Sequence, residues 1–327
     1  MIHKAVTRPA PSVSAPLSLA TLALLTLALA LLSLILPAAA RGEPHAEAGS
    51  AGLAFLKVGI GARAVGMGEA FTAAADDAFA LYWNPAGIAD IGGVDLGLMH
   101  AEWFQDVRLE YLGAVMGRGR DALGLSFVFN TTGEIERRDG PSAEPLGTFD
   151  AHDLAWGFSY ARCIGERWRV GGSLKALYEK IHLDDGWGWA VDAGALYETP
   201  ISGLTAGGSV RNLGPKMTLR DESFKLPAVF VLGLSYRPDR LQFDSGGLLL
   251  GADLSKPVDN RLRVHLGGEW RLQDLIALRT GYGIGYDERG LAAGLGLRQG
   301  RWMIDYAWVP YSSDLGDTHR ISLGIDL

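Results

Sequence analysis

The last 234 residues of this 327-residue chain (327 − 93) repeat a two-residue alternation of apolar with small or polar side chains. In one segment, Leu123, Leu125 and Phe127 alternate with Gly124 and Ser126. Successive side chains of a β-strand point to opposite faces, so this period predicts strands with one apolar face. Fourteen strands are predicted, beginning near Val94, Leu109, Leu123, Leu154, Trp168, Trp187, Leu204, Ala228, Leu248, Leu262, Ile276, Leu291, Trp302 and Ile321.

The strand spacing and the connections between strands predict a transmembrane barrel. The 234 residues give about 17 per strand, and about ten suffice for a tilted strand to cross a bilayer. The connections fall into short ones at 117–121, 162–167, 198–202, 271–274 and 298–301, and longer ones at 131–148, 212–226 and 309–319. Short periplasmic turns and long outer loops are typical of outer-membrane barrels. The connection at 237–246 is an exception, because it is long but falls on the side predicted to have short turns. We therefore expect an all-β fold, a 14-stranded antiparallel transmembrane β-barrel.

A soluble β-sandwich would show the same alternation. The predicted inner face, however, carries many charges of both signs, which a dry soluble core would not bury. We therefore expect a water-filled lumen lined by Asp95, Lys175, Glu179, Asp192, Asp253, Arg263, His265, Glu269, Arg298 and Asp305. Aromatic residues near strand ends are typical of membrane interfaces, and here they are Trp168, Tyr178, Trp187, Tyr197, Tyr236, Trp270, Trp302 and Trp308.

The stretch from Gly61 to Gly87 lacks this alternation and predicts a compact plug. Asp76 is placed to cap a short helical run, which must end near Trp83 because the residue before a proline is pushed out of the helical region. Asn84 as N-cap and Pro85 at the first helical position predict a second single turn. Two single turns cannot bury a face of their own. We expect them inside the barrel lumen.

The plug also holds the strongest candidate for a chemical site. We interpret Arg63, Asp76 and Asp77 as an ion-pair cluster with a helix cap, and a metal or acid–base cluster is the alternative. The histidines lack the spacing of metal ligands. No phosphate-binding glycine order and no nucleophile elbow is found. We therefore expect no enzymatic activity, no cofactor and no metal.

The beginning of the chain predicts an export signal. Lys4 and Arg8 precede an uncharged run at 17–36, and the alanines at 38–40 suit a signal peptidase. A transmembrane anchor is the alternative, because the run is about long enough to cross a bilayer. The predicted domains are a signal peptide at 1–40, a leader and luminal plug at 41–92, and the barrel at 93–327.

Charge and composition argue against a nucleic-acid partner and against an internal disulfide. Removing Lys4 and Arg8 takes the formal net charge from −7 to −9, so a nucleic-acid partner is not expected. The single cysteine, Cys163, in a predicted turn at 162–167, cannot form an internal disulfide. The 44 glycines are about twice the usual share, which suits a barrel whose strands bend and whose inner wall is crowded.

The run from Phe55 to Gly87 resembles the N-terminal signature of the PorV/PorQ family, which is related to FadL-type outer-membrane transporters. Its specific parts are Gly66-Met67-Gly68 and Asn84-Pro85-Ala86. The ending from Asp305 to Leu327 resembles that family's last hairpin, so the resemblance extends over the mature chain. Glu69 departs from the family, which commonly has a small residue there, and the final leucine departs from the usual Phe or Trp.

The resemblance implies two classes of function. PorV-like members act in type IX secretion and receive secreted cargo by its C-terminal domain, so cargo would contact the outer loops 131–148 and 212–226. FadL-like relatives instead carry long-chain fatty acids or hydrocarbons, and this is the alternative. The plug residues that would contact such a ligand, unless they only wedge the plug against the wall, are Phe71, Phe79, Leu81, Tyr82 and Trp83. Either role implies the outer membrane of a Gram-negative-type bacterium, with lipid, the barrel assembly machinery, and cargo proteins or hydrophobic small molecules as partners.

Overall fold

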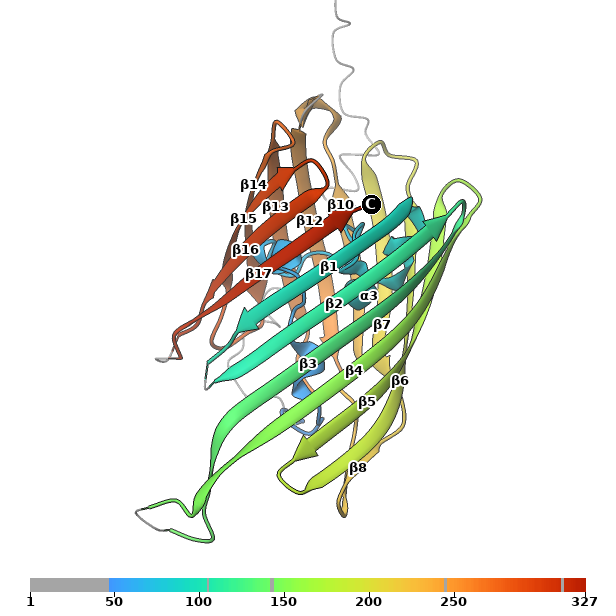
Figure 1. Cartoon of the computed structure of the whole chain (residues 1–327). Coiled ribbons are helices and arrows are strands. Elements are labelled where there is room, and N and C mark those ends of the chain that lie inside the picture. Colours follow the sequence, from blue (N-terminus) through green and yellow to red (C-terminus); the bar gives the residue numbers. More distant parts are fainter. Residues whose placement is uncertain (1–46, 105, 142–143, 244–245, 313–314) are drawn as a thin grey trace, which may run out of the picture. The chain divides into compact units, whose positions relative to one another are not determined.

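The computed structural model describes residues 47–327 except 105, 142–143, 244–245 and 313–314, so the predicted signal peptide lies outside the described residues. Fourteen of the described strands form a closed antiparallel barrel, as predicted (Figure 1). The barrel is closed by pairing of the first strand with the last and of the eighth with the ninth. In chain order these strands are β1 (Gly93–Glu102), β2 (Val107–Arg118), β3 (Asp121–Arg137), β4 (Gly147–Ile164), β5 (Trp168–Ile181), β6 (Asp184–Glu198), β7 (Leu204–Leu213), β10 (Val229–Tyr236), β12 (Gly246–Pro257), β13 (Arg263–Leu272), β14 (Ile276–Ile284), β15 (Leu291–Gln299), β16 (Trp302–Pro310) and β17 (Asp317–Asp326).

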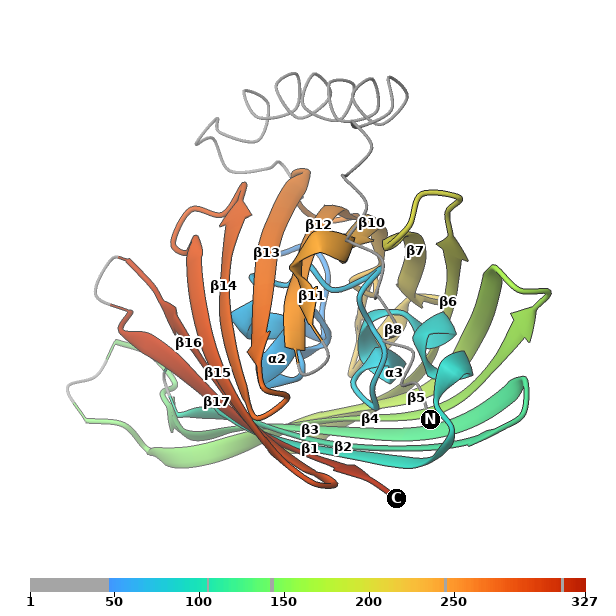
Figure 2. The ribbon, with the colours of Figure 1, turned by 90° about the horizontal axis from the view of Figure 1, so that it is seen from above.

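Short helices precede the barrel, and small strands occupy two of its connections. The helices before β1 lie inside the ring of strands, as the view from above shows for α2 and α3 (Figure 2). These additional elements are η1 (Ala54–Lys57), α2 (Ala62–Gly66), α3 (Ala80–Trp83), η2 (Pro85–Asp90), β8 (Met217–Leu219), β9 (Glu222–Phe224), η3 (Asp239–Leu241) and β11 (Gln242–Phe243).

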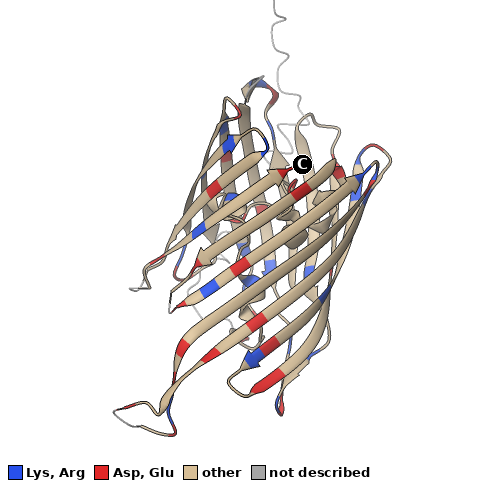
Figure 3. Ribbon diagram, viewed as in Figure 1, with Lys and Arg blue, Asp and Glu red and all other residues tan. Residues whose placement is uncertain are grey.

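The outer wall of the barrel is apolar because the two-residue period puts one face of every strand outside. In β10, buried and exposed residues alternate without interruption, and the side chains of Phe230, Leu232 and Leu234 are exposed. Most of the strand ribbon carries no charged residue (Figure 3). None of the described helices is long and apolar enough to cross a membrane.

The strands differ in length around the barrel. β3 and β4 have 17 and 18 residues, whereas β14, β15 and β16 have 9 each. The β3–β4 hairpin therefore reaches far beyond its neighbours, at the bottom of Figure 1. We call this end of the barrel the long-loop end, and the opposite end, where β1 begins and β17 finishes, the short-turn end.

The expectation of a water-filled lumen is wrong. The segment before β1 fills the lumen, and Ile60, Ala62, Met67 and Phe71 are fully buried there. Seven of the ten predicted inner-face residues are buried, whereas Glu179 and Arg263 are partly buried and Arg298 is exposed. The plug supplies partners to Asp253, His265 and Glu269. Charge on the inner wall therefore indicates polar contact with a plug here, and it does not require bulk water.

One smaller expectation also needs correction. Cys163 lies within β4 and not in a turn, because β4 and β5 remain paired as far as Ile164 and Trp168. The end of the leader contacts the barrel, since Gly52 N donates to the carbonyl oxygen of Lys225 at 3.1 Å.

Candidate functional site: the luminal plug

The glycine run of the plug lets two backbones approach closely. Gly68 has φ of +64°, and a Cβ atom there would lie 2.6 Å from the backbone nitrogen of Tyr282 on β14. A Cβ on Gly66 would lie 3.0 Å from Cα of Gly294 on β15. Met67, between them, is fully buried. The run is glycine-rich because the plug backbone rests directly on the wall backbone.

Asn84 caps η2 as predicted. Its side-chain oxygen accepts from Ala86 N at 3.2 Å, and Pro85 occupies the first helical position. The amide nitrogen of Asn84 donates to the carbonyl oxygens of Thr72 at 2.9 Å and Ala195 at 3.3 Å. The fully buried Asn84 therefore joins three segments: the start of η2, the plug chain and strand β6.

The predicted cap at Asp76 is wrong. Helix α3 begins later than expected, at Ala80, and no side chain caps it. Asp77, not Asp76, bonds to the backbone nearby, accepting from Phe79 N at 3.0 Å. Asp76 is instead held by arginines, since Arg63 and Arg237 donate to it at 2.5 and 3.0 Å.

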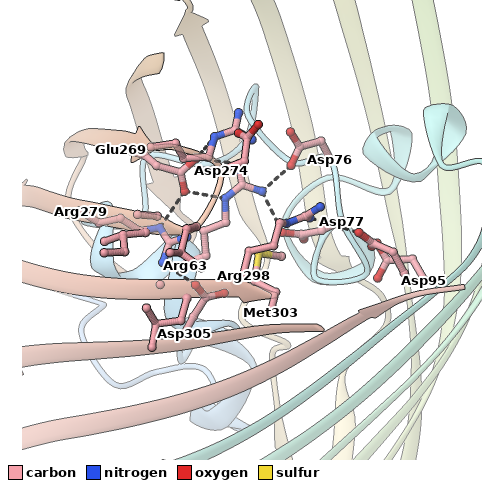
Figure 4. Close-up of a pocket in the computed structure, with 17 residues that line it drawn as sticks. Arg63, Asp76, Asp77, Asp95, Glu269, Asp274, Arg279, Arg298, Met303 and Asp305 are labelled. Atoms are coloured by element: carbon pink, nitrogen blue, oxygen red, sulfur yellow. Dashed lines mark hydrogen bonds and ion pairs between the residues drawn. The ribbon is translucent and has the colours of Figure 1, made fainter. Parts of the chain in front are cut away.

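Arg63 anchors one side of the plug to the wall, and its predicted ion pairs are confirmed. Besides Asp76, it donates to Asp77 at 3.0 Å, and through Nε to Glu269 on β13 at 2.9 Å. Burial alone would lower the pKa of Arg63, but Asp76, Glu269 and Asp77 raise it well above its ordinary value. Arg63 therefore carries a permanent charge. Figure 4 shows its side chain among Asp76, Asp77 and Glu269.

The anchor continues along the wall as a chain of alternating charges. Arg279 on β14 donates to Glu269 at 2.7 Å and to Asp305 on β16 at 2.6 Å. All three side chains are almost fully buried. Removing one member of such a network would leave a buried charge uncompensated, which is strongly destabilising.

The anchor borders a cavity of about 440 Å³ at the short-turn end of the barrel, shown in Figure 4. Its charged lining residues are Arg63, Arg271, Arg279, Arg298, Asp76, Asp77, Asp95, Glu269, Asp274, Asp305 and Asp326. Seven carboxylates against four guanidinium groups make this cavity acidic. Among the described residues, no group of three or more His, Cys, Asp or Glu side chains is arranged to hold a metal ion.

The opposite side of the plug is apolar. The five plug residues predicted to contact a hydrophobic ligand, Phe71, Phe79, Leu81, Tyr82 and Trp83, are all buried in one hydrophobic cluster. That cluster includes inward residues of the wall, among them Met99 on β1, Tyr111 on β2 and Leu177 on β5. The polar ends of two rings are satisfied within the plug, since Tyr82 Oη donates to Leu56 O at 3.1 Å and Trp83 Nε1 to Ile60 O at 2.7 Å.

Two small cavities adjoin these aromatic residues in the described part of the chain. Leu81 and Tyr82 border a cavity of about 10 Å³, and Trp83 borders one of about 30 Å³. A cavity of the larger size holds about two water molecules. The plug therefore seals the lumen in this structure, and a larger molecule can pass only if the plug moves.

At the long-loop end the connection between β14 and β15 holds the plug through Glu69. Arg289 donates to Glu69 at 2.7 Å and Tyr286 at 3.3 Å. Burial would raise the pKa of Glu69, but the Arg289 guanidinium brings it down to about 2. Glu69 has φ of +69°, a conformation that costs energy for a residue with a side chain. Its contacts offset that cost.

Sequence comparison found a family model that matches part of the chain. A model of an uncharacterised protein family, UPF0164, matches residues 37–185. Comparison with curated protein sequences gave no match.

Comparison of structures shows the same fold in two hydrocarbon channels. The CymD monoaromatic hydrocarbon channel superimposes with a TM-score of 0.60 and 16% identity, covering 82% of this chain and 96% of that chain. The toluene transporter TodX of Pseudomonas putida gives a TM-score of 0.57 and 12% identity, covering 81% of this chain and 96% of that chain. At these identities the likeness establishes the fold and not the ligand.

Proposed function

We propose that the protein is a FadL-like transporter that carries hydrophobic small molecules across the outer membrane. The observation that carries this proposal is the two-sided plug. One side is ion-paired through Arg63 to Glu269, which belongs to a buried charge network on β13, β14 and β16, and the other side is apolar against β1 to β5. The shared fold with two monoaromatic hydrocarbon channels supports it. Hydrocarbons and long-chain fatty acids are the expected ligands.

The difference between the two sides of the plug indicates which side can separate from the barrel wall. Moving the charged side would separate Arg63 from Glu269 and leave buried charges uncompensated, which is costly. Moving the apolar side exchanges one set of apolar contacts for contacts with an apolar ligand. We therefore place the route between the plug and the wall of β1 to β5, past Phe79 and Tyr82.

Two engineered disulfides test this route, in a Cys163→Ser background. A Cβ on Gly97 of β1 would lie 3.2 Å from Cβ of Ala78, and a Cβ on Gly251 of β12 would lie 3.3 Å from Cβ of Ala70. Both spacings are slightly below the usual disulfide range. Ala78→Cys with Gly97→Cys pins the apolar side, and Ala70→Cys with Gly251→Cys pins the plug to β12, beside the charged side. Because a Cβ on Gly251 would also lie 2.4 Å from the carbonyl oxygen of Ala70, each variant is compared with its own reduced form.

Uptake of radiolabelled toluene and of a long-chain fatty acid would be measured in proteoliposomes. The apolar-side disulfide should abolish uptake, and a reductant should restore it, whereas uptake with the disulfide to β12 should equal that of the same variant after reduction. Absence of uptake by the unmodified protein above protein-free vesicles contradicts the transport proposal. Equal uptake with both disulfides intact contradicts the proposed route.

A secretion role is the second candidate, supported by the resemblance of the plug signature to the PorV/PorQ family. The outer hairpin of β3 and β4 and the small β8–β9 hairpin offer a surface at the long-loop end for cargo. Its test is co-purification, after crosslinking, with exported proteins that carry a C-terminal sorting domain. Loss of such crosslinks on shortening the β3–β4 hairpin would support this role, and absence of any crosslinked cargo would count against it.

Both roles require an exported, non-enzymatic protein that the barrel assembly machinery inserts into the outer membrane. The apolar outer wall supports this location. The protein should migrate faster on gels before boiling than after boiling, and should resist carbonate extraction. Release by carbonate would contradict a membrane-embedded barrel.

A further inference from the structure

A small cavity on the long-loop side of the plug is lined by charged groups that do not balance. It measures about 30 Å³ and lies between the plug and strands β7, β10, β12 and β13. Its charged lining residues are Lys57, Glu69, Arg211, Asp253 and Arg263. The balance of these charges decides what the cavity can hold.

Arg211 on β7 is the central group. The residue is only 8% exposed, and its Nε and Nη1 atoms have no hydrogen-bond partner. Its guanidinium carbon lies 4.8 Å from the ring centre of Tyr82 and 5.0 Å from that of Trp83. These two aromatic residues, predicted to contact a hydrophobic ligand, instead contact a cation through their ring faces.

Arg263 on β13 repeats the arrangement across the cavity. Its guanidinium carbon lies 4.2 Å from the ring centre of Tyr286, and its buried Nε also lacks a partner. Neither Arg211 nor Arg263 has a carboxylate within ion-pair distance among the described residues. Aromatic faces stabilise a cation but do not neutralise it.

Of the other three charged groups, two are paired with a residue of opposite charge, and Asp253 has a buried Oδ1 atom without a hydrogen-bond partner. Lys57 is paired with Asp259 at 2.5 Å, and Glu69 with Arg289 at 2.7 Å. Asp253 accepts from the backbone nitrogens of Phe71 and Thr72 and is the remaining negative charge. Two guanidinium groups against one carboxylate leave one positive charge in excess.

We propose that this cavity binds one small monovalent anion of about the size of chloride, held by Arg211 and Arg263. Water would fill the volume, but it would supply hydrogen bonds and leave the excess buried charge in place, which is costly. A carboxylate with a hydrocarbon tail does not fit, because the cavity is no larger than about two water molecules. The anion would fix Tyr82 and Trp83 through Arg211 and so stabilise the seated plug.

The direct test uses bromide as the probe, since its anomalous scattering distinguishes it from water. Crystals of the full barrel soaked in sodium bromide should show one anomalous peak within hydrogen-bonding distance of Arg211 and Arg263. Soaked crystals of Arg211→Met should lose this peak and keep peaks elsewhere on the surface. A soaked crystal with surface peaks and none in this cavity would overturn the proposal.

A solution test covers the case in which a variant folds poorly. The thermal unfolding of the wild-type barrel in detergent is compared in sodium chloride and in sodium gluconate at equal ionic strength. Only an anion that fits the cavity should stabilise the folded state by binding to it. The midpoint temperature of unfolding should rise with the chloride concentration and not with the gluconate concentration. Arg211→Met and Arg263→Met should each lose most of this rise, and Arg298→Met, in the cavity at the short-turn end, should retain it. Equal midpoints of the wild type in the two salts, or a rise unchanged in both cavity variants, would refute the site.

Discussion

Neighbouring glycines on β13 allow a sharp test of how closely the plug is fitted to the wall. A Cβ on Gly267, which faces inward, would lie 2.1 Å from the carbonyl oxygen of Met67. A Cβ on Gly268, which faces outward, would lie 3.5 Å from its nearest neighbour, Cδ2 of Leu250. Ordinary contact begins at 3.4 Å, so Gly267→Ala requires a backbone shift of about 1.3 Å (3.4 − 2.1) and Gly268→Ala requires none.

Overpacking of this kind costs about 1–3 kcal/mol. The cost falls on the plug, because the barrel strand is held by hydrogen bonds to both neighbours and the plug chain is not. If it lowers the free energy of local plug opening, amide exchange there should accelerate about 5- to 150-fold. The amides to follow are Glu69 N and Ala70 N, which bond to Ala64 O and Met67 O.

Hydrogen exchange by mass spectrometry would be compared for both variants, with heat modifiability reporting whether each barrel is folded. Gly267→Ala should accelerate exchange in peptides covering Met67 to Ala70, and Gly268→Ala should not. Equal exchange in the two variants would refute the direct contact between plug and wall. Failure of both variants to fold would refute the assignment of Gly268 to the outer face.

Three further outcomes are expected. Asn84→Ala should leave the barrel heat-modifiable but loosen the plug, because a lost cap costs about 1 kcal/mol and two hydrogen bonds to carbonyl oxygens are lost as well. Unchanged permeability to hydrophobic probes would contradict a gating role of the plug. Leu327→Asp should sharply lower the folded amount on gels while Leu327→Phe should not, because Leu327 pairs with Val94 at the closing seam; equal yields would show that assembly does not depend on this residue. The pKa of Glu69 in the folded state is about 2, against an ordinary 4.5, so its contribution to stability is complete above about pH 4.5 and is lost as the pH falls towards 2. In acid titrations followed by hydrogen exchange, Glu69→Gln should therefore lose less stability over that pH range than the wild type. Parallel curves for the two proteins would contradict the Glu69–Arg289 pair.

The strands could be predicted from the sequence because their signal is local. Alternation within a segment such as 123–129 needs no knowledge of distant residues, and strand number and order follow from it. The turn at Asn84 and Pro85 was predictable for the same reason, since a cap and a proline act within a few residues. Helix α3 was less predictable, because it has no side-chain cap and depends on packing.

The contacts of the site could not be predicted in this way. Arg63 and Glu269 are 206 positions apart, and their meeting depends on how deep the plug sits relative to β13. Glu269 and Asp305 were placed on the inner face by alternation, but Arg279, which joins them, was not singled out. Tyr82 and Trp83 were taken for ligand contacts because an aromatic pair looks the same in sequence whether it faces a hydrocarbon or Arg211.

The position of the plug constrains the order in which the barrel can be assembled. Only residues 91 and 92 separate η2 from β1, so the plug is delivered with the first strand. Ala62 N of the plug donates to Ser322 Oγ on the last strand at 2.8 Å, across 260 positions. Since β17 also closes the ring by pairing with β1, its arrival completes the wall and the seat of α2 together. If the plug is misplaced when β17 pairs with β1, the closed barrel holds it in the wrong position. Repositioning the plug would then require the β1–β17 pairing to open.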